Sequence, residues 1–236
     1  MQRQEPPSAF GPEHAAVYDS RYEKLSAMRD ALYLLTSGVL ADLPEEARIL
    51  CVGAGTGNEL IYLAQKYPRW QFTAVEPSPS MLEICRRKAD EHNITSRCVF
   101  HEGYLDSLPP TVPFDAATSL LVSQFLLATA DRIDFFAEIA KRLRPGGYLV
   151  NADLASDTTT ESYESLLNVW IRLMRETGST PEQLKTMREV YRRDVAVLPV
   201  EQVGSLITAG GFEPPALFLQ TVLIHAWFTQ RKRIND

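Results

Sequence analysis

Three glycines at alternate positions follow a short apolar run in the stretch ILCVGAGTGN, residues 49–58. Glycine tolerates backbone conformations and close contacts that other residues do not, so Gly53, Gly55 and Gly57 indicate a backbone that closely approaches a ligand. A pyrophosphate held at a helix N-terminus is one such ligand. The dinucleotide pattern G-x-G-x-x-G, however, would place its third glycine at position 58, where the chain has Asn58. The glycines therefore indicate a binding site and leave its ligand open.

An acidic residue, Glu76, ends the next apolar run and lies 19 residues after Gly57. At that place in a parallel sheet wound with helices, a carboxylate can accept hydrogen bonds from both hydroxyls of a ribose. Alternatively, Glu76 caps the helix that begins at position 79, a role that Ser78 could equally fill. Bare glycine backbone suits a flat or zwitterionic group. A nucleoside joined to an amino acid, S-adenosylmethionine, fits both features.

Apolar runs alternate with segments of helical periodicity, which is typical of an α/β fold with a parallel sheet. We expect strands at 48–52, 71–76, 97–102, 115–121 and 148–152, with helices at 57–67, 79–92 and 130–143 between them. The last of these helices should stop at a turn over residues 144–147, Arg-Pro-Gly-Gly. A helix at 200–209 and strands near 215–220 and 222–229 complete the sheet, and this final hairpin should introduce an antiparallel edge strand.

Two helical segments flank this core. Residues 13–41 should form one or two helices that act as an N-terminal cover. Residues 157–196 form a helical insertion with balanced charge, which suggests a solvated lid or a subunit contact. One part of the insertion carries an apolar stripe of Leu166, Leu167, Val169, Trp170, Leu173 and Met174. This stripe can pack on the chain's own sheet edge or on the same helix of a second subunit, and we expect a homodimer.

Composition excludes several classes of function. The net charge of −6 provides no overall attraction for nucleic acid, and the only tight basic cluster, Arg231 to Arg233, is typical of a solvated tail. The cysteines Cys51, Cys85 and Cys98 lack metal-binding spacing and are predicted to be reduced core thiols. No apolar run is long enough to span a membrane, and the first residues do not resemble a secretory signal. We therefore expect a soluble, cytoplasmic protein that does not bind nucleic acid.

Seven stretches of the chain carry a family resemblance. They are AAVYD (15–19), ILCVGAGTGNEL (49–60), VEPSPSML (75–82), FHEGYLDSLP (100–109), FDAATSLLVSQFL (114–126), LRPGGYLV (143–150) and AGGFEP (209–214). In this order and at these separations, they make nearly the whole chain resemble class I S-adenosylmethionine-dependent methyltransferases. The resemblance implies a single Rossmann-like domain, residues 1–236, with a seven-stranded sheet in the order 3-2-1-4-5-7-6 whose last strand is antiparallel.

The same resemblance assigns residues to a cofactor that lies across the carboxyl ends of strands one, two and four. It implies Gly53, Ala54 and Gly55 beside the methionine portion, Glu76 at the ribose, and Pro77, Met81, Tyr104 and Leu105 around the adenine. On the side of the reacting sulfonium and the acceptor it implies Leu120, Ser123 and Gln124. Tyr18 belongs to the segment that folds over the cofactor in the family, although it could equally just pack its helix on the core.

Two positions depart from the family pattern. Cys51 stands where the family commonly has an acidic residue in the first strand, and Tyr104 replaces the usual acid at the adenine. A cysteine cannot offer a carboxylate to the cofactor's ammonium, so backbone carbonyls or another residue must satisfy that group. Tyr104 could stack on the adenine or serve only for packing. The two changes leave open a weaker or a modified cofactor.

A narrower resemblance concerns that modified cofactor. The stretches LLVSQFLL (120–127), MRETGSTPEQL (174–184) and MREVYRRDVAVLPVEQV (187–203) are similar in layout to carboxy-S-adenosylmethionine synthases. This implies that Arg188 pairs with the extra carboxylate of carboxy-S-adenosylmethionine, near the reacting end of the cofactor. The plainer interpretation is that Arg188 forms surface ion pairs with Glu182, Glu189 or Asp194.

The predicted activity is transfer of the sulfonium methyl group to a small molecule, with S-adenosylhomocysteine as product. In-line displacement needs alignment and desolvation more than a strong acid or base. The four histidines, His14, His92, His101 and His225, are each interpreted as structural or surface residues, so no catalytic residue and no metal site is predicted. Two alternatives remain: a nicotinamide oxidoreductase with the same strand, glycine loop and acid, and a non-catalytic methyltransferase-like subunit that holds a partner.

Overall fold

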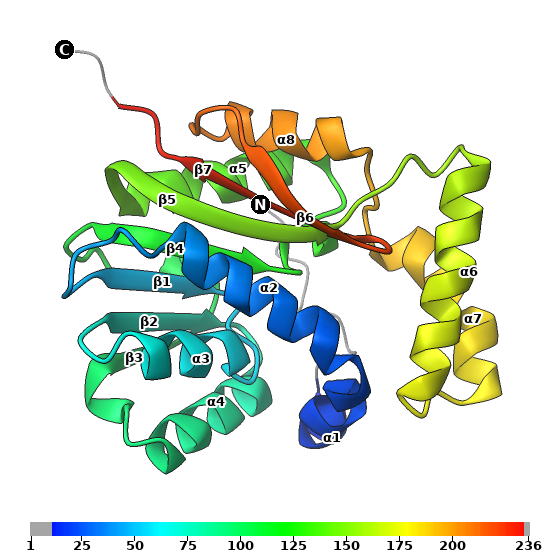
Figure 1. Cartoon of the computed structure of the whole chain (residues 1–236), viewed down its shortest axis with the longest axis horizontal. Helices are drawn as coiled ribbons and strands as arrows, with labels where there is room; N and C mark the ends of the chain where they lie inside the picture. Colours follow the sequence, from blue (N-terminus) through cyan, green and yellow to red (C-terminus); the bar gives the residue numbers. More distant parts are fainter. Residues whose placement is uncertain (1–10, 234–236) are drawn as a thin grey trace.

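The computed structural model describes residues 11–233, and its centre is one seven-stranded β-sheet (Figure 1). The strands are β1 (Arg48–Val52), β2 (Gln71–Glu76), β3 (Cys98–Glu102), β4 (Phe114–Leu120), β5 (Leu143–Leu154), β6 (Ala216–Thr221) and β7 (Ile224–Gln230). Their order across the sheet is β3-β2-β1-β4-β5-β7-β6. The α/β fold class and the strand order expected from the sequence are confirmed.

The first five strands run parallel, whereas β7 is antiparallel to both β5 and β6. The expected antiparallel hairpin and antiparallel last strand are therefore confirmed. The strand that runs against the first five, β7, lies inside the sheet, and β6 forms the edge. The chain first passes to the outside as β6 and then returns between β6 and β5.

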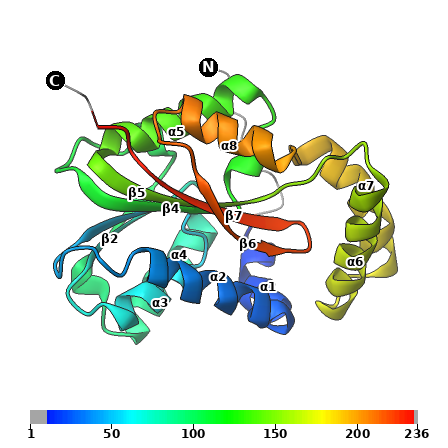
Figure 2. The ribbon, with the colours of Figure 1, turned by 45° about the horizontal axis from the view of Figure 1, so that its top comes forward.

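Helices cover both faces of this sheet. Their bounds are α1 (Pro12–Tyr22), α2 (Ser26–Val39), α3 (Asn58–Lys66), α4 (Pro79–Glu91), α5 (Thr129–Arg142), α6 (Glu161–Glu176), α7 (Pro181–Asp194) and α8 (Val200–Ala209). In Figure 2, α2, α3 and α4 lie on one side of the strands, and α5 and α8 lie on the other. The buried core is correspondingly divided between these two faces.

The apolar run at 49–52 shows why the strands could be recognised. Ile49 and Cys51 pack under α3 and its neighbours, while Leu50 and Val52 pack on the face that carries α5 and α8. Successive strand residues point to opposite faces, so a strand that is covered on both faces is apolar at every position. The predicted bounds of β1 and β2 are confirmed. Those of α3 and α5 differ from the prediction by one residue at each end, and α4 begins where predicted and ends one residue earlier.

The entry into β5 differs from the prediction. α5 ends at Arg142 and β5 begins at Leu143, so residues 144–147 belong to the strand and the expected turn is wrong. The reason is backbone pairing with the segment that follows β7. Gly146 N donates to Arg231 O over 3.0 Å, and Arg231 N donates to Gly147 O over 2.8 Å.

The helix α1 of the N-terminal cover and the insertion lie at the carboxyl ends of the central strands, while α2 crosses one face of the sheet (Figure 1). The cover consists of α1 and α2, and the insertion consists of α6 and α7, which stand together beside the sheet (Figure 1). Of the predicted apolar stripe, Leu167, Trp170 and Met174 are buried, in a cluster shared with Leu32 of α2, whereas Val169 is exposed. Of the two packing modes considered for this stripe, the structure shows packing within the chain.

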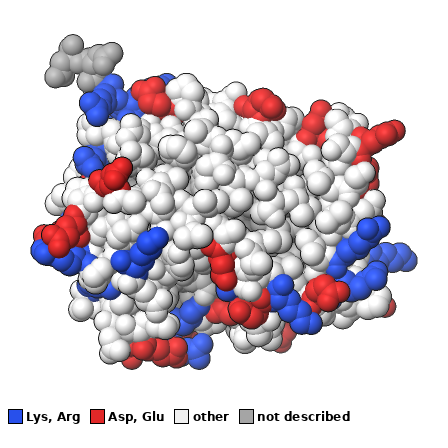
Figure 3. Space-filling view, in the orientation of Figure 1, with Lys and Arg blue, Asp and Glu red and all other residues white. Residues whose placement is uncertain are grey.

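No helix among residues 11–233 is both long and apolar enough to cross a membrane. On the face shown in Figure 3, basic and acidic side chains are interspersed along the margins, and the middle is largely uncharged. Exposed Leu34 and Leu35 of α2 and Leu217 of β6 contribute apolar surface to the molecule.

Candidate functional site

The glycine loop between β1 and α3 has a backbone that requires glycine. Gly53, Gly55 and Gly57 have φ angles of 68°, 55° and 81°, a left-handed region that residues with a side chain rarely adopt. A Cβ on Gly53 would lie 2.4 Å from Val122, and one on Gly57 would lie 2.5 Å from the sulfur of Cys85. A Cβ on Gly55 would meet no protein atom within 4 Å. Of these three glycines, Gly55 is therefore the one beside which a ligand group could lie against bare backbone.

Glu76 ends β2 with its carboxylate held against this loop. Its Oε2 accepts a hydrogen bond from Gly55 N and its Oε1 accepts one from Ser78 N, each over 2.9 Å. The residue is 8% exposed, and burial raises the pKa of its carboxyl group. Each carboxylate oxygen can accept a further hydrogen bond, so the group is preorganised for two ribose hydroxyls. The capping role is filled by Ser78, whose Oγ accepts from Met81 N.

The other residues expected around the cofactor follow neighbouring strands. Ala54 follows β1, Pro77 and Met81 follow β2, and Tyr104 and Leu105 follow β3. Because β1, β2 and β3 are adjacent and parallel, the five residues lie together at the carboxyl ends of these strands. Ala54, Met81 and Leu105 are buried, while Pro77 and Tyr104 are half-buried. Their contacts with an adenine or methionine group remain predictions.

The N-terminal cover is fastened to the glycine loop by Asp19. Its Oδ1 accepts hydrogen bonds from Thr56 Oγ1 over 2.7 Å and from Asn58 Nδ2 over 2.8 Å, and its Oδ2 lies 3.0 Å from Lys88 Nζ on α4. Burial by itself would raise the pKa of Asp19, but these hydrogen bonds and the lysine charge lower it on balance. Sequence reasoning singled out the preceding residue, Tyr18, and missed Asp19, although both belong to the stretch AAVYD.

Tyr18 lies in the same cover, next to Asp19, which binds the glycine loop. Burial raises the pKa of its hydroxyl, and the charges of Asp19 and Glu76 raise it further. Its ring centroid is 4.9 Å from that of Tyr22. These observations agree both with a residue that closes over a ligand and with one that packs α1 onto the core, so the role of Tyr18 stays a prediction.

Strand β4 ends in a strained turn beside the glycine loop. Leu121 has a φ of 63°, which is unfavourable for a residue with a side chain, and its N donates to Ala152 O over 2.7 Å. The turn sets Val122 against Gly53. Leu120, expected on the side of the reacting sulfonium, is partly buried at this end of the strand. The reacting end of a cofactor on the loop would therefore face this turn.

Ser123 and Gln124 belong to a buried polar network. Ser123 Oγ donates to Asp153 Oδ2 over 2.6 Å, and Gln124 N donates to Asp153 Oδ1 over 3.0 Å. Arg132 of α5 lies 3.1 Å from the same carboxylate and also donates to Ala196 O at the end of the insertion. Burial raises the pKa of Asp153, although Arg132 and the hydrogen bonds lower it. In this structure the two residues hold the loop after β4, and their predicted contact with an acceptor is untested.

Arg188 joins the two helices of the insertion. Its Nη1 lies 2.6 Å from Glu164 Oε2, and its Nη2 donates to Asn168 Oδ1, also over 2.6 Å. The guanidinium therefore forms a partly exposed ion pair. Its ion-pair partner is Glu164 of α6, rather than the residues of α7 suggested by the sequence.

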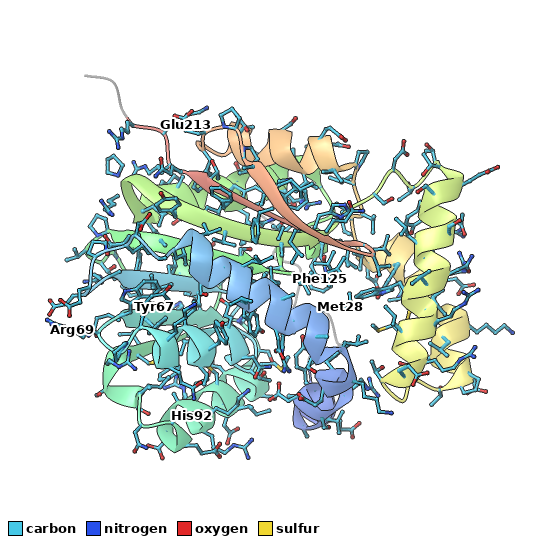
Figure 4. All side chains as sticks on the ribbon, viewed as in Figure 1. Met28, Tyr67, Arg69, His92, Phe125 and Glu213 are labelled. Carbon is cyan, nitrogen blue, oxygen red and sulfur yellow. The ribbon has the colours of Figure 1, made fainter. Side chains whose placement is uncertain are left out.

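Apolar side chains surround the carboxyl ends of β4 and β5. Met28 of α2, Phe125 after β4 and Tyr22 of α1 are partly buried and pack against the same cluster as Trp170 of α6. Figure 4 shows Met28 and Phe125 between α2 and the insertion. An acceptor that approaches the cofactor from this side meets aromatic and aliphatic surface.

The histidines with described side chains have other partners. His92 contacts Gln65 Nε2 over 3.1 Å, His101 contacts Ser107 Oγ over 2.8 Å, and His225 contacts Leu223 O over 3.1 Å. Burial lowers the pKa of His225. Within residues 11–233, no three His, Cys, Asp or Glu side chains are grouped so that they could hold a metal ion.

A sheet in this order, with a glycine loop after its first strand and an acid at the end of its second, has the fold of class I methyltransferases. Residues 49–147 match a family model described as methyltransferase domain. This match, together with the strand order, confirms the predicted resemblance to class I S-adenosylmethionine-dependent methyltransferases.

Three known proteins illustrate the relationship. Trans-aconitate 2-methyltransferase of Streptomyces coelicolor is 30% identical over 173 residues, which cover 73% of this chain and 53% of that protein. Carboxy-S-adenosyl-L-methionine synthase of Salmonella paratyphi C is 25% identical over 155 residues, covering 66% and 62%. The solved structure of CalO1, a methyltransferase in calicheamicin biosynthesis in its SAH-bound form, superposes with a TM-score of 0.63 at 17% identity, covering 92% of this chain and 57% of that one.

These matches differ in what they support. The chain spans about half the length of the trans-aconitate enzyme. The match to the carboxylated-cofactor synthase is weaker in identity, so the narrower resemblance is no better supported than the general one. The likeness to CalO1 shows the fold alone.

Proposed function

We propose that the protein is an S-adenosylmethionine-dependent methyltransferase that acts on a small-molecule acceptor and releases S-adenosylhomocysteine. The observation that carries this proposal is the carboxylate of Glu76, held by Gly55 N and Ser78 N at the carboxyl end of β2. A buried acid with both oxygens oriented beside an open glycine suits a ribose diol next to a ligand that runs along the loop.

The residues present fit this cofactor. Glu76 would accept the ribose hydroxyls, and the backbone of Gly53 to Gly55 would border the amino-acid portion. Pro77, Met81, Tyr104 and Leu105 would lie around the base. When bound, the cofactor supplies an electrophilic methyl group on a sulfonium. The chain's own contribution is to align the acceptor with that group and to exclude water, which lowers the barrier by positioning.

The acceptor would enter between the cover and the insertion. Leu121, Met28, Phe125 and Trp170 offer it an apolar surface there. Asp19 would hold α1 over the glycine loop while the acceptor reacts. The whole domain, residues 1–236, would work as one unit.

Calorimetric titration tests the proposal and its rivals. The purified protein should bind S-adenosylhomocysteine and S-adenosylmethionine, and it should not bind NAD. Binding of NAD alone would contradict the proposal in favour of an oxidoreductase. Methyl transfer to candidate acceptors, followed by formation of S-adenosylhomocysteine, separates an enzyme from a subunit that binds the cofactor without catalysis.

We propose the ordinary cofactor rather than its carboxylated form because Arg188 is already engaged by Glu164 and Asn168. The parent protein should then bind S-adenosylmethionine and carboxy-S-adenosylmethionine with similar affinity, and Arg188→Ala should change neither. A strong preference of the parent for the carboxylated form, lost in Arg188→Ala, would overturn this choice.

We also propose a homodimer in the cytoplasm. Val169 of α6 and Val190 of α7 are more than a third exposed, which would suit a further helix contact on the insertion. Cys51, Cys85 and Cys98 are free thiols, as is usual in a reducing compartment. Light scattering that gives a monomer mass at micromolar concentration would refute the dimer, and cell fractionation tests the location.

A further inference from the structure

Glu59, in the first turn of α3, carries a buried carboxyl group that the proposed mechanism does not use. The residue is 8% exposed. Thr118 Oγ1 on β4 donates a hydrogen bond to its Oε1 over 2.5 Å, and the thiol of Cys51 on β1 lies close enough to the carboxyl group to lower its pKa. The carboxyl group therefore lies against side chains from the two central strands.

The position of this group is set by the glycine loop. Cys51 and Thr118 are paired in the register of β1 and β4, and Cys51 lies two residues before Gly53. Glu59 itself lies four residues after Gly55. Cys51 and Thr118, which neighbour the carboxyl group, thus lie at the base of the glycine loop, where the amino-acid portion of the proposed cofactor would bind.

The surroundings of Glu59 lack a compensating cation. Within residues 11–233 it forms no ion pair, and the titratable groups that face it are Cys51 on β1, Tyr33 on α2 and Cys85 on α4. Burial raises the pKa of Cys51 and of Tyr33 well above their ordinary values and raises that of Cys85 to about 12, so all three are neutral at physiological pH. A buried carboxylate without a cation is unfavourable, and burial raises the pKa of Glu59 to about 7.

We propose that Glu59 binds the ammonium group of the cofactor's amino-acid portion, with the Cys51 thiol and the Thr118 hydroxyl orienting its carboxylate. This inference rests on the proposed function. The ammonium is the cation that the site otherwise lacks, and a charge-assisted hydrogen bond in a buried setting is stronger than one between neutral groups. If the carboxyl group only filled space in the core, its replacement by an amide would leave the affinity for the cofactor unchanged.

A pH dependence follows from the same geometry. The ammonium favours the ionised carboxyl group, so binding must remove the proton from any Glu59 that is protonated in the free protein. Affinity for the intact cofactor should therefore rise with pH as Glu59 ionises. Glu76 also has a raised pKa, but its carboxylate is assigned to the ribose and would affect any ligand that contains the nucleoside.

The test compares two ligands and three proteins by calorimetry. The ligands are S-adenosylhomocysteine and 5′-methylthioadenosine, which shares the nucleoside and the sulfur but has no amino-acid portion. The proteins are the parent, Glu59→Gln, and the control Glu83→Gln, which changes an exposed glutamate on α4. Each titration is run from pH 5.5 to 7.5, and thermal melting checks that every variant is folded.

We expect Glu59→Gln to weaken the binding of S-adenosylhomocysteine by about tenfold or more at pH 7.5, which is the scale of one charge-assisted hydrogen bond. Its affinity for 5′-methylthioadenosine should be unchanged, and Glu83→Gln should match the parent with both ligands. In the parent, affinity for S-adenosylhomocysteine should rise by about tenfold across this pH range beyond any change seen with 5′-methylthioadenosine, and Glu59→Gln should abolish this extra rise.

Three other outcomes would overturn the inference. Equal S-adenosylhomocysteine affinity in the parent and Glu59→Gln would show that the carboxyl group does not contact the ligand. Equal losses for both ligands would assign Glu59 to the structure of the loop. A parent that binds neither ligand would overturn the proposed function itself, and with it the inference.

Discussion

Substitution of Glu76 by alanine tests the site most directly. The carboxylate is fixed by Gly55 N and Ser78 N, so it would bind a ribose diol with little further loss of side-chain freedom. Its removal deletes two charge-assisted hydrogen bonds to the ligand, which we expect to cost about 1.5–3 kcal/mol in total. The dissociation constant for S-adenosylhomocysteine should therefore rise by about 10- to 150-fold.

The assay is isothermal calorimetry at pH 8, with thermal melting to confirm folding. Ser78→Ala is the matched control because it removes the side-chain cap of α4 and leaves the backbone N–H that donates to Glu76. The control should lower stability by about 0.5–2 kcal/mol and leave affinity unchanged. If Glu76→Ala lowered the melting temperature while affinity stayed at the parent's value, Glu76 would be a structural residue only, and the argument for a ribose site would be refuted.

Three more predictions concern the surrounding elements. Gly55→Ala and Gly178→Ala place a Cβ at positive φ where no protein atom lies within 4 Å, so both should lose about 1–3 kcal/mol of stability, but only Gly55→Ala should weaken S-adenosylhomocysteine binding in calorimetry; equal affinities would mean that no ligand lies beside Gly55. Asp19→Ala should release α1 and speed S-adenosylhomocysteine dissociation several-fold in stopped-flow measurements, and an unchanged rate would show that α1 does not close the site. Arg132→Met should lower the free energy of unfolding by about 3–5 kcal/mol in urea, because it leaves the buried carboxylate of Asp153 without its cation. A free energy of unfolding equal to the parent's would contradict this role of Arg132.

Much of the fold was predictable because its signals are local. The run Ile49 to Val52 is apolar at every position because the sheet is covered on both faces, and the positive φ angles explain the glycines that follow. The entry into β5 was not predictable in the same way. Proline and glycine in residues 144–147 indicate a turn, and only the pairing with Arg231, far along the chain, makes these residues part of a strand.

Side-chain roles near the acceptor were harder to predict because they depend on partners from distant segments. Ser123 and Gln124 fall at the expected place after β4, yet both are bound to Asp153 of β5, and the network extends to Arg132 of α5. Asp19 attaches α1 to a loop almost forty residues away, and the sequence offers only its place beside Tyr18 as a signal.

Cys51 and Glu59 illustrate that a comparison of single sequence positions does not detect an acid supplied by another element. Sequence reasoning treats Cys51 as the loss of an acid, because it compares one strand position with the same position in the family. The structure sets the carboxyl group of Glu59 beside that cysteine, delivered from the first turn of α3. A ligand contacts a carboxyl group in the same way whichever element carries it. The proposed role of Glu59 on α3 would therefore replace the acid that is missing from position 51 of β1. The pattern of apolar residues in α3 places Glu59 on the buried face, and a glutamate at a buried position is the signal that could have identified it.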